Sequence, residues 1–190
     1  KDIRNVVFLG HSGSGKTTLI ETMLFESGII PRRGSVEAHN TISDFTDLER
    51  ERENTIYSHL MHAKWHNNKI NIIDTPGFDD FIGEVVSSLK VSDTALILLN
   101  AASGVEVGTE IVWEYVQNYQ TPALFVINQM DHPKADYDTT LEQAKNRFGN
   151  KVIPIQYPYN SGEKFNSIID VLRMTMYVFP ENGGKPEKMP

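Results

Sequence analysis

Residues 10–17 limit the possible folds of this 190-residue chain more than any other segment, because they read Gly-His-Ser-Gly-Ser-Gly-Lys-Thr. This octapeptide matches G-x-x-x-x-G-K-[ST], a glycine-rich loop whose backbone N–H groups surround nucleotide phosphates. The apolar run Val6–Leu9 precedes the loop and predicts a buried strand, and Lys16–Ser27 predicts a helix. Because a helix N-terminus favours an anion, these segments predict a phosphate-binding strand–loop–helix unit.

The chemistry of phosphate and Mg²⁺ binding explains each residue type in this loop. Glycines let the backbone turn tightly and direct several N–H groups at one anion. Lys16 adds a positive charge on the β- and γ-phosphates, and the Thr17 hydroxyl is a hard oxygen ligand for Mg²⁺. The predicted phosphate-binding residues are Gly10, His11, Ser12, Gly13, Ser14, Gly15, Lys16, Thr17 and Thr18. The alternative, a glycine-rich turn with a surface lysine, is disfavoured by the flanking strand and helix.

The composition excludes several other classes of protein. Hydrophobic residues make up 39% and charged residues 23%, which suits a globular domain with a core. There is no cysteine, so disulfides and thiolate metal sites are excluded. No apolar run is long enough to cross a membrane and no secretory signal is visible, so we expect a cytoplasmic protein. A net charge of −7 argues against a broad basic face for nucleic acid.

Apolar runs alternate with helical patterns along the chain. Expected strands after Val6–Leu9 are Tyr57–Trp65 and Ile70–Ile73, joined by a hairpin turn at residues 66–69, and then Thr94–Asn100 and Ala123–Asn128. Expected helices are Phe81–Lys90, Val107–Asn118 and Tyr137–Phe148. This alternation predicts an α/β, three-layer P-loop fold with a mostly parallel sheet and one antiparallel hairpin edge.

Other segments carry weaker patterns. Residues 28–56 have little periodicity, so we expect a mobile loop that serves the phosphate site. Val152–Tyr157 is a candidate strand, and Phe165–Phe179 is a mixed amphipathic stretch with no assigned element. The tail Pro180–Pro190 is rich in proline, glycine and lysine, so we expect it to be frayed.

Asp74-Thr75-Pro76-Gly77 follows directly on the expected strand Ile70–Ile73. An aspartate at a strand end can hold Mg²⁺ through water, and the N–H of Gly77 can reach a γ-phosphate. A plain Asp-x-Pro-Gly turn is the alternative.

Asn128-Gln129-Met130-Asp131 follows the last expected strand of the sheet. A carboxylate at Asp131 can accept from both N1–H and the N2 amino group of guanine, whereas adenine offers neither donor in that arrangement. Asn128 would tie this loop to the phosphate loop. Asparagine and aspartate are also common in turns, so the motif is weak alone but strong in this order along the chain.

Together these motifs resemble the GTP-binding domain of elongation factor G and its paralogues, the ribosomal translocases. The similarity covers essentially the whole chain; beyond the loops above it includes Ser43-Asp44-Phe45, Glu51-Arg52, Thr55-Ile56, Asp80-Phe81, Glu84-Val85, Asp93-Thr94-Ala95, Gly104-Val105, Thr109 and Trp113. The resemblance implies that Thr55 is the Mg²⁺ ligand of the first switch loop and that residues 74–80 form the second switch.

The resemblance also implies GTP and GDP with Mg²⁺ as cofactors, the ribosome as partner of the full-length factor, and a monomer. Residues 1–150 correspond to the GTP-binding core. Residues 151–190 resemble the start of the subdomain that the family inserts in this domain. No counterpart of the family's fifth nucleotide motif is found, so the chain is expected to be a fragment of a longer factor.

Several positions depart from the family's pattern. Phe78 stands where the family has a histidine that positions the attacking water, and a phenyl ring can neither donate nor accept. Ser12 replaces an apolar residue, Gly13 an aspartate, and Glu53-Asn54 a Gly-Ile pair, so Ser12 and Asn54 alter the apolar gate beside that histidine. Gln129 replaces the lysine of the base motif.

We therefore expect a GTPase whose hydrolysis is weakened, with Lys16, Thr55, Gly77 and the Phe78 position at the chemical step. Tolerated drift is the alternative explanation of the substitutions. Two other functions stay open: a non-hydrolysing ribosome-binding GTP sensor or regulatory paralogue, and a metabolic kinase or ATPase with the same loop. The base motif argues against the kinase or ATPase.

Three further patterns have simple structural explanations. We favour these explanations for the histidines and the aromatic residues and leave the charged run open. His59, His62 and His66 suggest a metal site, but a spacing of three puts the first two on opposite faces of a strand. The alternating charges of residues 47–53 predict either a solvated segment or a ribosome contact. Trp113 and Tyr115 are expected to be core and flank residues.

Overall fold

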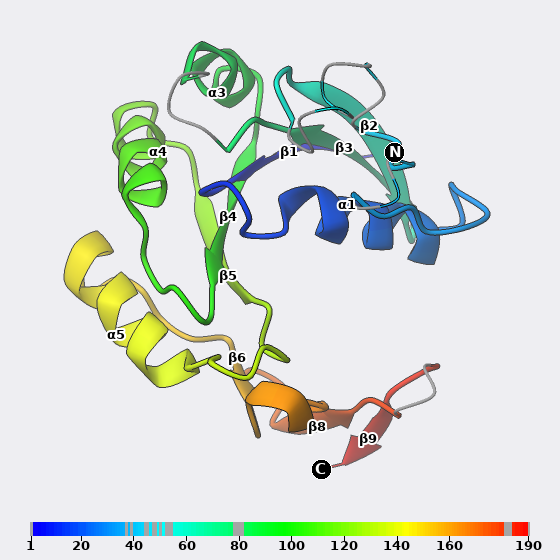
Figure 1. Cartoon of the computed structure of the whole chain (residues 1–190), viewed down its shortest axis with the longest axis vertical. Coiled ribbons are helices and arrows are strands. Elements are labelled where there is room, and N and C mark those ends of the chain that lie inside the picture. The colour runs from blue at the N-terminus through cyan, green and yellow to red at the C-terminus, as the bar shows by residue number, and fades with distance from the viewer. Residues whose placement is uncertain are drawn as a thin grey trace. The chain divides into compact units, whose positions relative to one another are not determined.

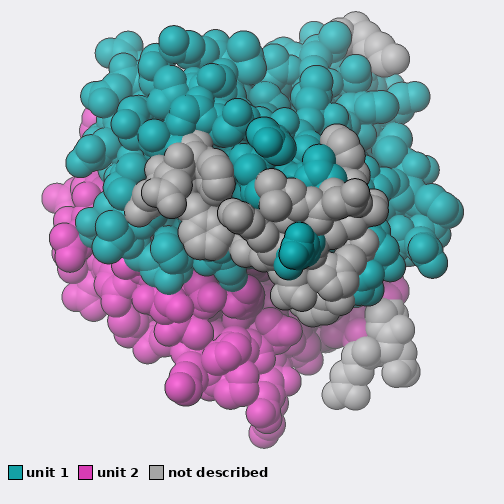
Figure 2. Space-filling view, turned by 45° about the horizontal axis from the view of Figure 1, so that its top comes forward, with its two compact units in different colours: residues 1–99, 106–126 teal, residues 100–105, 127–190 magenta. Residues whose placement is uncertain are grey.

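The computed structural model describes residues 2–36, 38, 40–43, 46, 49, 51, 55–77, 82–180 and 184–189 (Figure 1). The chain divides into two compact units, shown in different colours in Figure 2. The first unit comprises residues 1–99 and 106–126, and the second comprises residues 100–105 and 127–190. Across the described residues, no helix is long and apolar enough to cross a membrane.

The main sheet has five strands in the order β2-β3-β1-β4-β5. Their bounds are β1 (Ile3–Leu9), β2 (His59–Trp65), β3 (Asn68–Asp74), β4 (Thr94–Asn100) and β5 (Ala123–Asn128). Strand β1 pairs in parallel with both β3 and β4, and β2 pairs antiparallel with β3 at the edge. The predicted mostly parallel sheet with one antiparallel hairpin edge is therefore confirmed.

Three helices of the first unit cover the two faces of this sheet: α1 (Lys16–Glu26), α3 (Ile82–Leu89) and α4 (Val107–Asn118). Successive residues of a strand point to opposite faces, so β1 contributes to two cores. Phe8 packs in one core with Ile20 and Leu24 of α1. Leu9 packs in the other core with apolar residues of α3 and α4, such as Val112. These layers confirm the predicted three-layer α/β fold.

Two aromatic residues of α4 behave as the sequence predicted. Trp113 and Tyr115 are partly buried against the core that α3 and α4 form on the sheet. The ring of Trp113 also packs on that of Phe125, with 5.3 Å between their centroids. Both residues therefore contribute to packing.

Several predicted boundaries in the first unit need adjustment. Strand β1 begins at Ile3 rather than Val6, and β3 covers Asn68–Asp74 rather than Ile70–Ile73. Strand β2 begins at His59 rather than at Tyr57, and the hairpin turn has two residues, 66 and 67, between Trp65 and Asn68. Helix α3 begins at Ile82, and residue 81 lies outside the described residues. The two-residue turn is tight enough to place His66 in the left-handed region, with φ 51°.

Helix α5 (Tyr137–Phe148) of the second unit begins with a side-chain cap. Asp136 accepts from the backbone N–H of Thr139 at 3.0 Å and from its hydroxyl at 2.8 Å. Such a cap satisfies donors that the first helical turn leaves unpaired. The other elements of this unit are β6 (Gln156–Pro158), the 3₁₀ turn η2 (Gly162–Lys164), β7 (Ser167–Asp170), β8 (Thr175–Val178) and β9 (Glu187–Met189).

Strands β6 to β9 form an antiparallel sheet in sequence order, which the sequence analysis did not predict. The candidate strand at residues 152–157 is mostly wrong, because β6 covers only residues 156–158. The unassigned stretch at residues 165–179 is a β7–β8 hairpin, whose turn is held by Asp170 accepting from the N–H groups of Leu172 and Arg173, each at 3.0 Å. Fraying of the tail is wrong for residues 187–189, because β9 pairs with β8.

Candidate nucleotide-binding site

The glycine-rich loop joins the end of β1 to the start of α1. The three glycines predicted to shape it, Gly10, Gly13 and Gly15, have φ values of 137°, 78° and 89°, which residues with a side chain rarely adopt. A Cβ atom on Gly10 would also lie 2.5 Å from the carbonyl oxygen of Leu98 in β4. The loop conformation therefore requires glycine, as the motif predicts.

Lys16 lies inside this loop instead of on the surface. Its side chain is 6% exposed, and its ammonium donates to the carbonyl oxygens of Gly10 at 2.9 Å and His11 at 3.1 Å. A buried ammonium group needs such partners because desolvation is costly. The charge of Lys16 is thus held against the backbone of the loop.

Gly77 of the second motif lies against the same loop. A Cβ atom added to Gly77 would lie 2.6 Å from Nζ of Lys16 and 2.7 Å from the backbone nitrogen of Ser12. No side chain fits that space. The end of β3 and the phosphate loop therefore meet at Gly77.

The other loop residues surround this contact. Ser14 is buried and its backbone N–H donates to the carbonyl of His11 at 3.3 Å. The imidazole of His11 lies 3.7 Å from the carboxylate of Glu106. Ser12 is half-buried and Thr18 is exposed.

Three side-chain oxygens from separate segments converge beside Lys16. The hydroxyl of Thr17 donates to Oδ2 of Asp74 at 2.9 Å and lies 3.3 Å from the hydroxyl of Thr55. Asp74 is fully buried and Thr55 is 7% exposed. Hydroxyl and carboxylate oxygens are the ligands that Mg²⁺ prefers. The convergence of Thr17, Thr55 and Asp74 thus fits the predicted metal, either directly or through water.

The base motif forms a separate loop in the second unit, at the end of β5. The carbonyl of Asn128 accepts from the N–H of Ala101 at 2.9 Å, and the N–H of Gly162 donates to the carbonyl of Met130 at 2.8 Å. These backbone bonds fix the loop on both sides. Asp131 is exposed.

Gln129 has a structural partner in this loop. Its backbone is left-handed, with φ 59°, and its side-chain oxygen accepts from Nδ2 of Asn100 at 2.7 Å. A lysine at this position has no acceptor for that donor. The predicted tie between Asn128 and the phosphate loop stays a prediction.

The substitutions expected to weaken hydrolysis lie outside the described residues. Phe78 and the gate residue Asn54 both fall there, as does Glu53. The sequence hypothesis about water positioning therefore rests on the chemistry of these residue types.

The sequence analysis missed buried carboxylates that hold the segment between α1 and β2. Glu21 of α1 is 1% exposed and accepts from the N–H groups of Gly34, at 3.2 Å, and Ile42. Glu21 lies one residue after Ile20 on the buried side of α1, so its position on the helix is a signal that the analysis could have used.

Glu49 is an exception to the solvated segment expected at residues 47–53, where Glu51 is exposed and the other five residues lie outside the described part of the chain. The carboxylate of Glu49 is 0% exposed and lies 2.7 Å from Nε2 of His59. His59 is itself buried, whereas His62 is exposed, so these histidines do point to opposite faces of β2 as predicted. An alternating charge pattern cannot reveal that one member is buried, because the partner His59 is ten residues away.

The geometry defines a class of protein: an α/β domain with a phosphate loop, a second motif touching that loop and a site suited to Mg²⁺. More specifically, the chain belongs to the family described as Elongation factor Tu GTP binding domain, which matches residues 1–181.

Proteins similar to this chain are found among curated proteins and solved structures. The chain is 32% identical over 190 residues to an elongation factor G-like protein of Thermotoga maritima, covering 100% of this chain and 27% of the relative. It is 38% identical over 187 residues to elongation factor G of Mycoplasma pneumoniae, covering 98% and 27%. A crystal structure of a Thermus thermophilus protein matches with TM-score 0.92 and 32% identity, covering 100% of this chain and 28% of that one. The chain thus spans about a quarter of the length of these relatives.

Proposed function

We propose that this chain is the GTP-binding part of a longer, translocase-type translation factor that binds Mg²⁺ with GTP or GDP and changes conformation between them. The observation that carries the proposal is the convergence of Thr17, Thr55 and Asp74 beside Lys16. It joins the phosphate loop to the segments expected to be the two switches. A switch domain needs such a junction, because the γ-phosphate must be sensed by residues that can leave it.

In this proposal each part of the phosphate site has one task. Lys16 and the loop amides bind the β- and γ-phosphates, and the N–H of Gly77 contacts the γ-phosphate. Thr17 and Thr55 bind Mg²⁺ directly and Asp74 binds it through water. A bound Mg²⁺ ion neutralises charge that develops on the phosphate oxygens.

Guanine selectivity is assigned to Asp131. Its exposed carboxylate projects from the loop and can accept from two donors of guanine. Asn128, the last residue of β5, and Gln129 hold the loop in place. Adenine would leave this carboxylate without a donor, so ATP is expected to bind poorly.

Hydrolysis is proposed to be slow because Phe78 cannot orient water. Phosphoryl transfer depends on positioning and charge stabilisation, and a water-orienting residue is a recurring part of such sites. Losing a positioned acid–base group costs about 10²–10⁴-fold in rate, which corresponds to roughly 3–5 kcal/mol of barrier.

Several broader assignments follow the family relationship and stand as part of the proposal. Residues 1–150 form the GTP-binding core, and residues 151–190 begin an inserted subdomain. The full-length factor acts as a monomer on the ribosome in the cytoplasm. The four-stranded antiparallel sheet, which lies entirely beyond residue 155, supports a distinct second part of the chain.

The test compares GTP with ATP and then measures hydrolysis in the full-length protein. We expect titration calorimetry to give a clear preference for GTP, and ribosome-stimulated turnover to be slow beside a histidine-containing paralogue. Phe78→His is expected to restore part of the rate, because groups that act together are not additive. Equal affinity for ATP and GTP overturns the assignment of the base, and turnover as fast as the paralogue's overturns the proposed weak hydrolysis.

The identity of Phe78 also favours a second candidate, a ribosome-binding GTP sensor that needs no hydrolysis. Single-turnover hydrolysis with and without ribosomes separates the two functions. A slow reaction that ribosomes accelerate supports the GTPase, and a rate that ribosomes leave unchanged supports the sensor.

A further inference from the structure

Glu49 has an unusual number of partners for a carboxylate in an irregular segment. Its Oε2 atom accepts from the hydroxyl of Thr46 at 2.6 Å, and Oε1 accepts from the N–H of Ile56 at 3.0 Å and of Tyr57 at 3.2 Å. Nε2 of His59 lies 2.7 Å from the same Oε1. Burying a carboxylate costs free energy unless hydrogen bonds replace its water. Here both oxygens are satisfied, so this buried charge is part of the local structure.

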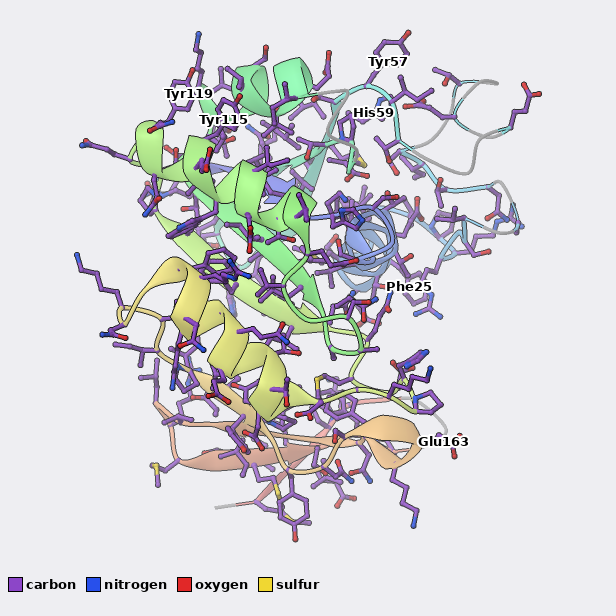
Figure 3. The ribbon with its side chains drawn as sticks, turned by 60° about the vertical axis from the view of Figure 1, so that its left-hand side comes forward. Phe25, Tyr57, His59, Tyr115, Tyr119 and Glu163 are labelled. Atoms are coloured by element: carbon purple, nitrogen blue, oxygen red, sulfur yellow. The ribbon has the colours of Figure 1, made fainter. Side chains whose placement is uncertain are left out.

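These partners surround Thr55. Ile56 and Tyr57 follow Thr55 directly, and His59 is the first residue of β2, paired across the hairpin with Asp74. Figure 3 shows His59 pointing into the protein and Tyr57 pointing outward. The bonds from Glu49 therefore fix the backbone after Thr55 to the strand end that carries Asp74.

We propose that Glu49 is a positioning residue that holds Thr55 at the metal site and so favours the triphosphate over the diphosphate. This inference rests on the proposed function. The hydroxyl of Thr55 lies 3.3 Å from that of Thr17, and fixing the backbone on the C-terminal side of Thr55 favours this place. Glu49 supplies that fixation through the two N–H groups that follow.

The electrostatics of Glu49 agree with a permanent charge at this place. Burial raises the pKa of its carboxyl, but the hydrogen bonds from Thr46, Ile56, His59 and Tyr57 together outweigh burial and leave the pKa below its ordinary value of 4.5. The carboxylate is thus ionised at neutral pH and can accept from all of its donors.

A second carboxylate holds the same segment from another element. Glu84 of α3 accepts from the N–H of Ser58 at 2.8 Å, and the hydroxyl of Ser88 donates to that of Ser58 at 3.0 Å. The start of β2 therefore stays attached to α3 without Glu49. Loss of Glu49 is expected to release Thr55 while leaving β2 in the sheet.

The experiment replaces Glu49 by glutamine, which keeps the volume but removes the charge and one acceptor. The matched control is Glu51→Gln, two residues further on and exposed. Calorimetry on the full-length protein, in Mg²⁺, measures affinity for a non-hydrolysable GTP analogue and for GDP. We expect Glu49→Gln to lower the triphosphate-to-diphosphate affinity ratio by about 10-fold or more, since hydrogen bonds to a charged group are lost. Glu51→Gln is expected to leave the ratio unchanged.

The ratio separates positioning from mere stability, because general loosening weakens both nucleotides equally. An unchanged ratio, or an equal loss for both nucleotides, overturns the proposal. If circular dichroism shows that Glu49→Gln does not fold, Thr46→Ala removes the 2.6 Å bond to the carboxylate and the 3.2 Å bond from the N–H of Glu49. The other donors to the carboxylate stay, so this variant is expected to lower the ratio less but in the same direction. An unchanged ratio in that variant then overturns it. A wild-type protein that binds ATP as well as GTP instead overturns the proposed function.

Discussion

The phosphate site and the base loop of this chain are held together by different means. At the phosphate site, side chains from separate segments contact each other directly, and Lys16, Thr55 and Asp74 are all buried. In the base loop, mostly backbone hydrogen bonds fix the conformation and Asp131 projects from it exposed. Phosphate recognition should therefore depend on shape fixed by packing, whereas base recognition should depend on the chemistry of one carboxylate.

The largest effect is expected from changing that carboxylate alone. Asp131→Asn replaces one oxygen of the carboxylate that we propose accepts from guanine by an amide that donates. Losing hydrogen bonds to a charged group costs about 1.5–3 kcal/mol, so GTP affinity should fall about 10- to 150-fold. Xanthosine triphosphate should bind better than before, because it presents an acceptor there. Titration of both nucleotides checks this, and a parallel loss of both would mean that shape also governs the base loop.

The next largest effect is expected from a substitution that fills space at the phosphate site. Gly77→Ala puts a Cβ atom against Nζ of Lys16 and the backbone of Ser12. Overpacking of this kind costs about 1–3 kcal/mol of unfolding free energy, and nucleotide affinity should fall with it.

Gly83→Ala in α3 is the matched control for that variant. A Cβ atom there meets nothing within 4 Å. Alanine is favoured over glycine in a helix interior by about 0.8–1.0 kcal/mol. Gly83 is the second residue of α3, so the control should be stabilised by that amount at most. Thermal unfolding of the two variants compares them. Equal effects would show that the close approach at Gly77 does not govern the site.

A smaller effect is expected from removing a side-chain contact that supports the base loop. Gln129→Ala removes the acceptor for Nδ2 of Asn100. One neutral hydrogen bond contributes about 0.5–1.5 kcal/mol, so we expect a modest loss of stability and a loss of GTP affinity of about 10-fold at most. The GTP-over-ATP preference should survive. Loss of that preference would show that the conformation of the loop, and not Asp131 alone, selects the base.

The smallest effect concerns pH and the second unit alone. Burial, with smaller contributions from Tyr157 and Asp138, raises the pKa of Tyr137 to about 12 from its ordinary value of 10.0. The folded state thus favours the neutral phenol, which donates to the carbonyl of Gln156 at 2.9 Å. Its stabilising contribution is complete below pH 10 and is lost as pH rises toward about 12. The pKa of Tyr157 is also raised, chiefly because its hydroxyl donates to Asp138. Ultraviolet titration should therefore find late-ionising tyrosines, and Tyr137→Phe should remove the component of Tyr137.

The sequence predicted the strand–loop–helix unit around residues 10–17 well because its signals are local. The loop of residues 10–17 fixes glycines, a lysine and a threonine at set spacings, and the continuous apolar run of β4 identifies a buried strand. The similar run of β5 predicts a central strand wrongly, because β5 lies at the edge of the sheet and is half-buried or exposed. The burial of Glu49 could not be predicted, because it depends on a histidine ten residues away and on the packing of an irregular segment.

The second unit was predicted less well for a related reason. Its strands β6 to β9 are three or four residues long and mostly half-buried or exposed, so they carry little alternation of apolar and polar residues. The pairing of β7 with β8 instead depends on the turn that Asp170 holds. A short strand of this kind becomes recognisable only when its partner is known.

Strand β1 has a consequence for how this domain can change over evolution. It pairs with β3 and β4 at once, placing Phe8 opposite Asp74 and Leu9 opposite Ile97, and Gly10 follows directly. Inserting one residue would move the loop by about 3.3 Å and exchange the two faces of the strand. Insertions elsewhere, such as in the turn at residues 66 and 67, leave that alignment intact. Lineages of this domain can therefore exchange residues of β1 for others of similar size and polarity, but they cannot change its length.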